Sequence, residues 1–198
     1  MSMKYDSLQP CCRFFHPLVV LVVLLAFATV ALHAQMGNMP MTPPPAGAAP
    51  LSPAATAKVT VADGTIDIHY NSPRMRGRKI MGDLVPYGKV WRTGANPATT
   101  IITSVPLKFG SLLVPAGTHT LYSLPSATEW LLIVNNQTGQ WGLVYDAAKD
   151  LGRIPMLAKP LATPQEEMTL TFENTTAAST ELHIRWETTD RYIVITAP

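Results

Sequence analysis

Cysteine is nearly absent from this chain. Of its 198 residues only Cys11 and Cys12 are cysteines, and both lie ahead of a long apolar run. If that run is a cleaved export signal, the mature protein has no cysteine. Disulfide bonds, thiolate metal sites and a cysteine nucleophile are then excluded together.

Charge is also scarce. The chain has 15 Lys and Arg against 13 Asp and Glu, a formal net charge of +2. It therefore lacks the basic excess of a general nucleic-acid binder, and no nucleic-acid partner is expected. The histidines beyond the apolar run, His69, His119 and His183, are far apart in the sequence. Because a metal site needs three or four converging ligands, no metal site is predicted.

Local catalytic signatures are missing as well. The chain has no G-x-S-x-G, no H-E-x-x-H and no dinucleotide-binding fingerprint. Gly82 and Gly88 suggest a phosphate loop, but five residues separate them instead of four, and Val90 replaces the Ser or Thr that would hold magnesium. These absences predict no catalytic residue and no cofactor. A triad assembled from distant residues would leave no local mark, so a dispersed active site stays open.

What is present begins with an apolar segment. Residues 18–32 are apolar or small, Lys4 and Arg13 precede them, and the small residue Ala34 follows. This order is typical of a signal peptide, so residues 1–34 are predicted to be cleaved and the protein to be periplasmic or secreted. The alternative is an inner-membrane anchor formed by residues 14–34. A helix of fifteen apolar residues reaches about 22 Å, short of a hydrocarbon core of about 30 Å.

A linker and one domain are expected after the signal. Residues 35–57 carry no charge and contain six prolines, so they are predicted to be a disordered linker. Residues 58–198 suffice for a single domain.

Within the domain, apolar and polar residues alternate with a period of two, as Ile66, Ile68 and Tyr70 do. Such a period indicates strands with one buried face. Nine short runs of this kind, separated by turn signals, are residues 58–62, 65–70, 99–103, 118–124, 129–135, 142–146, 168–173, 181–187 and 192–196. They predict an all-β domain, either an antiparallel β-sandwich or a small barrel of about nine short strands. Residues 146–150 fit a single helical turn.

The most informative stretch, residues 72–100, has no strand period. It reads SPRMRGRKIMGDLVPYGKVWRTGANPATT, and it is followed by VPAGT at 114–118, LY at 121–122 and WG at 141–142. This sequence closely resembles the signature of a bacterial exported family catalogued as domain of unknown function 2911. The resemblance covers most of residues 65–197. It implies an export signal and a β-rich domain, but no established activity or cofactor.

Cations gather at the start of this stretch. Arg74, Arg76, Arg78 and Lys79 lie within six residues, next to a proline and a glycine that disfavour regular structure. Guanidinium groups on a loop can form bidentate hydrogen bonds with carboxylates, phosphates or sulfates. They can equally pair with acids of the same domain. The sequence leaves both interpretations open.

A second group of candidates follows. Strand alternation would place Trp91 and Arg92 on opposite faces, with Trp91 and Trp186 in the core. Arg92 is exposed if Trp91 fills the core. If Arg92 points inward instead, it needs a carboxylate, for which the candidates are Asp83, Asp146 and Asp150. A ligand site would instead combine cations and an amide with an aromatic platform, which suits anions and sugars. The candidate ligand-binding residues are Arg74, Arg78, Tyr87, Arg92, Asn96 and Trp141.

Three hypotheses for function follow. The first is a non-catalytic binding module of the cell envelope for an anionic or carbohydrate ligand or a protein partner. The second is a hydrolase of an envelope substrate, which requires a cleft with a His or Ser bonded to a carboxylate. The third is a purely structural module, in which internal acids pair with Arg74, Arg78 and Arg92. The positions of Arg78, Arg92 and Asn96 distinguish them, since convergence on one concave surface favours a ligand site.

Overall fold

The computed structural model describes residues 51–198, so the predicted signal peptide and most of the predicted linker lie outside the described residues. One short 3-10 helix, η1 (Ala147–Lys149), falls within the expected helical turn. The strands are β1 (Ala54–Val61), β2 (Gly64–Asn71), β3 (Thr99–Thr103), β4 (Leu107–Phe109), β5 (Leu112–Val114), β6 (Gly117–Pro125), β7 (Trp130–Asn135), β8 (Asp150–Glu173) and β9 (Ser179–Thr196).

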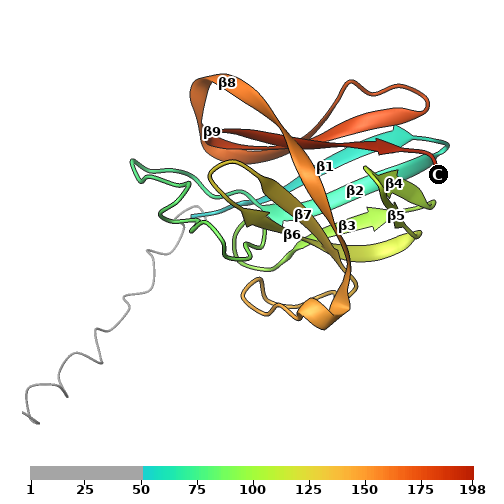
Figure 1. Ribbon diagram of the computed structural model, residues 1–198, viewed down its shortest axis with the longest axis horizontal. Helices are drawn as coiled ribbons and strands as arrows, with labels where there is room; N and C mark the ends of the chain where they lie inside the picture. The colour runs from blue at the N-terminus through green and yellow to red at the C-terminus, as the bar shows by residue number, and fades with distance from the viewer. Residues whose placement is uncertain (1–50) are drawn as a thin grey trace, which may run out of the picture. The chain divides into compact units, whose positions relative to one another are not determined.

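The prediction of an all-β antiparallel fold is confirmed. The nine strands form one sheet in the order β1-β2-β3-β6-β7-β8-β9-β4-β5. Figure 1 shows β8 curving away from β7, so that β9 comes to lie opposite the first strands. In agreement, β1 contacts β8 and β9 although they are distant in the strand order. Because β1 and β5 are free edges, the sheet is not closed and the barrel is excluded.

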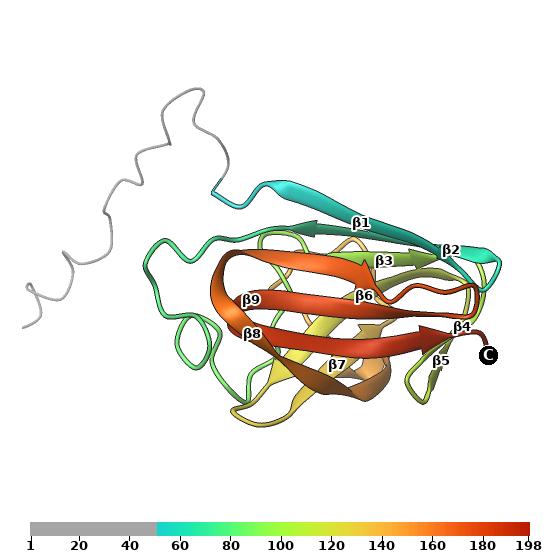
Figure 2. The same ribbon diagram turned by 90° about the horizontal axis from the view of Figure 1, so that it is seen from above.

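Two strands are much longer than the expected short runs. β8 has 24 residues, and its pairing with β9 shifts register on both sides of Gln165. These irregularities let the strand bend from one half of the sheet to the other. β9 doubles back near Glu187, whose φ is 55°, as Figure 2 shows. In a straight strand, residues seven positions apart would be about 23 Å apart, yet the side chains of His183 and Asp190 are in hydrogen-bond contact.

The strand period identified most of the buried face. Ile66, Ile68 and Tyr70 of β2 are buried, and so are Leu182 and Ile184 of β9, in the main core between the two halves of the sheet. A second, smaller cluster on the outer side contains Ala98, Tyr122 and Ile133. This small cluster supports the loops described below.

One predicted strand is wrong. Residues 142–146 form a loop, and Leu143 and Val144 in it are exposed. The loop is attached to β6, because the hydroxyl of Tyr122 donates to the carbonyl oxygen of Val144 at 2.7 Å. β4, β5 and the first half of β8 were not expected, and β1 begins at Ala54 instead of residue 58.

The long connection between β2 and β3, residues 72–98, lies at one end of the sheet, and the C-terminus lies at the other (Figure 2). Within residues 51–198, no helix has the length and apolar character needed to cross a membrane. The rest of the description concerns the end that carries the long loop.

Candidate functional site

The loop 72–98 is held against the sheet by backbone pairing. β3 pairs with β6 only as far as Leu121, which leaves Ser123 of β6 free on that side. Trp91 takes this place, and its N–H and C=O each bond the backbone of Ser123 at 2.8 Å. The side chain of Trp91 then packs on the main core, whereas Arg92 points the other way, as alternation predicts.

The turn after Trp91 is rigid and strained. Thr93 and Asn96 have positive φ angles of 52° and 60°. Asn tolerates this conformation, but a β-branched residue such as Thr rarely adopts it. Thr93 is held by a hydrogen bond of 2.6 Å between its hydroxyl and that of Ser123, and its carbonyl accepts from the Thr99 hydroxyl at 2.9 Å. Backbone strain that is held in this way is frequent at binding sites.

The beginning of the loop is fastened to β8. The buried Ser72 hydroxyl donates to the carbonyl of Met168 at 2.6 Å, and the Met168 N–H donates to the carbonyl of Pro73 at 2.9 Å. Farther along, both carboxylate oxygens of Glu187 accept backbone N–H groups, from Ile80 and Met81. The loop is thus a fixed structure on which side chains can be placed with precision.

A cleft of about 360 Å³ lies between this loop and the start of the described chain. We call it the arginine cleft, because three guanidinium groups and no carboxylate line it. Its lining residues are Leu51, Ser52, Pro73, Arg76, Arg78, Leu84, Val85, Trp91, Arg92, Gly94, Ala95, Asn96 and Trp186. Three predicted site residues, Arg78, Arg92 and Asn96, therefore converge on one concave surface.

Arg92 is the least satisfied cation of the cleft. Within the part of the chain that the structure describes, its Nε is buried and has no hydrogen-bond partner, and none of the expected acids pairs with it. Burial lowers the pKa of its guanidinium below the ordinary value. An unpaired buried donor costs about 1 to 3 kcal/mol, and no acceptor of the described residues offsets this cost.

The side chain of Arg92 passes over a glycine. A Cβ added to Gly142 would lie 2.0 Å from Cδ of Arg92 and 2.7 Å from the carbonyl oxygen of Asn96. Only glycine allows this close approach, so the WG pair at 141–142 has a structural reason. It fixes the path of the Arg92 stem.

The other two arginines brace the loop and still line the cleft. Arg78 donates from Nε to the carbonyl of Met75 at 2.9 Å and from Nη2 to the carbonyl of Arg74 at 2.8 Å. Arg76 donates from Nη2 to the carbonyl of Leu51 at 3.1 Å. These acceptors are neutral carbonyls, and neither guanidinium group forms an ion pair within the described residues. A carboxylate does lie near Arg76, because its backbone N–H donates to Oε1 of Glu166 at 2.9 Å. Sequence reasoning named Arg76 in the cation cluster but not in the site.

The remaining predicted residues lie elsewhere. Arg74 forms an ion pair with Glu167 at 3.0 Å and does not line the cleft. Tyr87 lines a different cavity, next to Lys79 and Arg191. Trp141 is 54% exposed on the 136–149 loop. The predicted aromatic platform is therefore not part of the arginine cleft.

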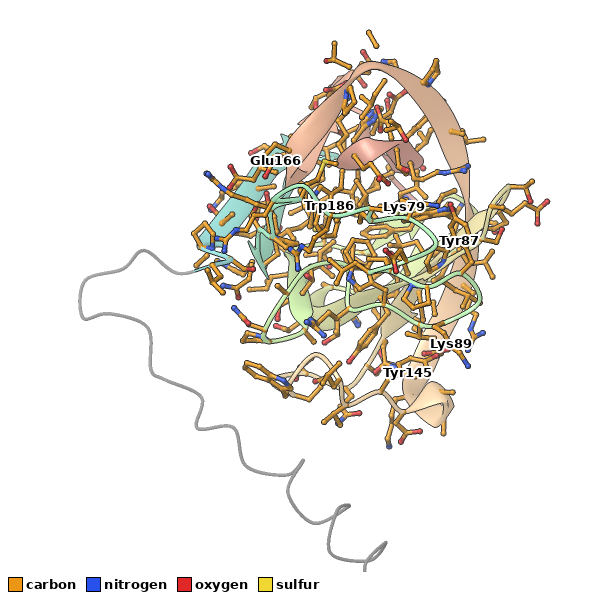
Figure 3. The ribbon with its side chains drawn as sticks, turned by 90° about the vertical axis from the view of Figure 1, so that its left-hand side faces the viewer. Lys79, Tyr87, Lys89, Tyr145, Glu166 and Trp186 are labelled. Carbon is orange, nitrogen blue, oxygen red and sulfur yellow. The ribbon has the colours of Figure 1, made fainter. Side chains whose placement is uncertain are left out.

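The aromatic residues that do line it are Trp91 and Trp186. Their rings stack with centroids 5.9 Å apart. The Trp91 ring is also perpendicular to the ring of Trp130, with centroids 6.3 Å apart. Trp186 is 2% exposed, as expected for the core, but Trp91 is only partly buried. Figure 3 shows Trp186 beneath the loop, at the centre of this end of the molecule. The two indoles form the apolar wall of the cleft.

Residues 52–195 match the family model described as "Protein of unknown function (DUF2911)". The chain belongs to this family. The match covers almost all of the described residues, so the family resemblance seen in the sequence is confirmed. No match was found among curated proteins or among solved structures.

The DUF2911 domain has a second, smaller cavity beside the arginine cleft. It measures about 220 Å³ and shares Leu84, Val85, Trp91 and Arg92 with the cleft. We call it the side cavity. Lys89 and Tyr145, which lie near each other in Figure 3, also line it.

Tyr145 belongs to a polar network at the edge of the side cavity. Its hydroxyl donates to Oδ2 of Asp150 at 2.7 Å and accepts from Nη2 of Arg153 at 2.9 Å. The amide of the buried Asn135 donates to Oδ1 of Asp150 at 2.9 Å. Burial and the adjacent Asp150 raise the pKa of Tyr145 to about 12.

This raised pKa predicts a loss of stability in alkali. A tyrosine in the unfolded chain ionises near pH 10, whereas folded Tyr145 keeps its proton to about pH 12. Its contribution is therefore full below about pH 10 and is lost as the pH rises to about 12. We expect urea unfolding to show a steeper decline over this range for the wild type than for Tyr145→Phe. Identical slopes for the two proteins would contradict the assignment.

The histidines form no metal site in the described residues. His69 and His183 do not face each other, because β2 and β9 are not neighbours in the sheet. Strict alternation with the buried residues Leu182 and Ile184 would place His183 on a solvated face. It is instead fully buried under charged side chains, with Nδ1 2.7 Å from Asp190 and Nε2 3.1 Å from Glu181. His119 is buried as well and contacts Asn136 at 3.1 Å.

Proposed function

We propose that this DUF2911 domain is a non-catalytic module that binds an anionic ligand in the arginine cleft. One observation carries the proposal: three guanidinium groups line a cleft that no carboxylate lines, and the buried Nε of one of them, Arg92, lacks a described partner. An anion in the cleft would supply acceptors for Arg92, and its charge would be stabilised by Arg76 and Arg78.

The distribution of charge supports this proposal. Residues 72–98 contain six of the 15 Lys and Arg residues of the chain and only one acid, Asp83. The chain as a whole has a net charge of only +2, so cations are enriched on the loop. Glu166, Glu167 and Glu187 bond the loop from outside the cleft and offset part of this excess. Such a field attracts anions to this end of the molecule and disfavours cationic ligands.

The other hypotheses have less support from the site. A sugar would need a flat aromatic surface, but Tyr87 and Trp141 lie outside the cleft and Trp186 is almost fully covered. Trp91 lines the cleft, but one face of its ring is stacked on Trp186. A hydrolase would need a His or Ser bonded to a carboxylate. Among the residues that line the cleft, the only such type is Ser52, which has no hydrogen bond to an acid. A structural module would need internal acids paired with Arg74, Arg78 and Arg92. Of these three, only Arg74 forms an ion pair within the described residues.

The location of the ligand follows from the proposed export. The apolar residues 18–32 support a signal for transport across the cytoplasmic membrane. We therefore propose a periplasmic or secreted anion as the ligand. A protein partner with an acidic segment would present the same carboxylate chemistry.

Titration with orthophosphate, followed by tryptophan fluorescence, tests the proposal because Trp91 lines the cleft. Arg92→Lys keeps the positive charge but loses the planar guanidinium group, which can donate two parallel hydrogen bonds to one anion. Since a charged hydrogen bond contributes about 1.5 to 3 kcal/mol, we expect affinity to fall by about tenfold or more. Thermal stability should stay close to that of the wild type.

Arg74→Lys is the matched control, since Arg74 lies on the same loop outside the cleft. It should bind orthophosphate within about twofold of the wild type, and sodium chloride at equal ionic strength corrects for screening. Unsaturable binding by the wild type, or equal loss in both variants, would refute the arginine cleft as the binding site.

A further inference from the structure

The side cavity differs from the arginine cleft in its chemistry. Most of its lining is apolar, from Leu84, Val85, Pro86, Val90, Trp91 and Leu143. Its two tyrosine hydroxyls are already occupied, because Tyr122 donates to the Val144 carbonyl and Tyr145 donates to Asp150. No acid lines it. The cavity therefore offers an unpartnered apolar volume.

The two spaces adjoin at Arg92. Arg92 lines both, together with Leu84, Val85 and Trp91, and its stem is held in place over Gly142. Lys89 adds a second cation to the side cavity. A ligand whose anionic group contacts Arg92 thus has apolar side chains directly beside that group.

The mouth of the side cavity is apolar as well. Leu143 is 76% exposed and Leu84 is 45% exposed, and they come from two different loops. Apolar side chains that line a cavity and remain exposed gain free energy when a ligand covers them. Cations next to an apolar mouth select a ligand that has both an anionic and an apolar part.

From these contacts, and resting on the proposed function, we infer that the ligand is an amphiphilic anion. Its head, a phosphate, sulfate or carboxylate, binds Arg92 and the cations of the arginine cleft. Its alkyl part enters the side cavity between Leu84 and Leu143. At about 220 Å³ the cavity accommodates a short chain or the first part of a longer one.

A series of n-alkyl monophosphates, from methyl to octyl, tests this inference with a constant head group. Each methylene that leaves water contributes about 0.8 kcal/mol, so affinity should rise up to about fourfold for each methylene that enters the cavity. The rise should end once the cavity is filled. Leu143→Gln should reduce the affinity for octyl phosphate several-fold and leave that for methyl phosphate unchanged.

Leu113→Gln is the matched control. Leu113 is an exposed leucine of β5 that does not line either cavity. This variant should keep the chain-length dependence of the wild type. Because Leu113 and Leu143 are both exposed, neither substitution should impair folding, which a thermal melt checks.

The outcomes separate the two proposals. Binding of methyl phosphate with no gain from longer chains would overturn the amphiphile and leave the anion site standing. No binding of any member would overturn the anion site itself. If octyl phosphate gains the same affinity over methyl phosphate in the wild type and in Leu143→Gln, its alkyl chain binds outside the side cavity. Binding to phosphatidylglycerol vesicles without a response to soluble octyl phosphate would assign the apolar mouth to a membrane surface instead, and would also overturn the inference.

Discussion

Trp186→Ala should lower the free energy of unfolding by about 3 to 5 kcal/mol, the usual cost of deleting a large buried aromatic. Trp186 is 2% exposed, stacks on Trp91 at 5.9 Å between centroids, and donates from Nε1 to the carbonyl of Glu166 at 3.2 Å. Truncation leaves a cavity under the loop and an unpaired carbonyl. Denaturation in guanidinium chloride, with the slope m fitted for each protein, measures the loss.

Trp141→Ala is the control for this experiment. The same number of atoms is removed, but Trp141 is 54% exposed, so the change should stay within about 0.5 kcal/mol. A comparable loss in both variants would mean that the 136–149 loop is packed more tightly than its exposure indicates. An unchanged Trp186→Ala would contradict the described core.

The effect of Trp186→Ala on the site is a separate consequence. Trp186 forms part of the wall of the arginine cleft and supports Trp91, which precedes Arg92. A binding site built on a rigid scaffold loses precision when its support is removed. Binding should therefore weaken in Trp186→Ala even though no guanidinium group is changed.

The strands could be predicted where one face is buried and the other is solvated. The run at 99–103 coincides with β3, since Thr99, Ile101 and Thr103 are buried and Ile102 is exposed. The runs at 168–173 and 181–187 are likewise parts of β8 and β9. β4 and β5 have three residues each, too few for a period to be recognised. In 142–146 apolar residues suggested a strand, but they form a loop, in which Leu143 and Tyr145 line the side cavity.

The site was predictable in part for the same kind of reason. Arginines on an irregular loop, and a Trp-Arg pair at alternating positions, indicated some of the side chains that line the arginine cleft, namely Arg78, Arg92 and Asn96. The acceptor of each arginine depends on contacts far apart in sequence. Arg74 meets Glu167, 93 positions away, whereas Arg92 meets no described acid. Alternation alone cannot distinguish these two outcomes.

The fold-back of β9 creates a feature that no local pattern indicates. Asp190 is buried, accepts from Nε of Arg185 at 2.8 Å, and contacts Nδ1 of His183 at 2.7 Å. The His183 ring stacks on Tyr192 with centroids 4.8 Å apart, and Arg185 also donates to Glu173. The cluster joins the two parts of β9 to β8, beside the hairpin that carries Trp186.

Asp190→Ala should therefore destabilise the domain by about 3 to 5 kcal/mol, because it leaves Arg185 and His183 without their buried acceptor. Asp83→Ala is a matched control, since Asp83 is exposed and makes no side-chain hydrogen bond or ion pair within the described residues; it should change stability by about 0.5 kcal/mol or less. Unfolding of both variants in guanidinium chloride measures the two changes in the free energy of unfolding. A small loss for Asp190→Ala would mean that Glu173 and Glu181 compensate for the missing carboxylate. The fold-back of β9 would then depend on the remaining acids of the cluster and not on Asp190 alone.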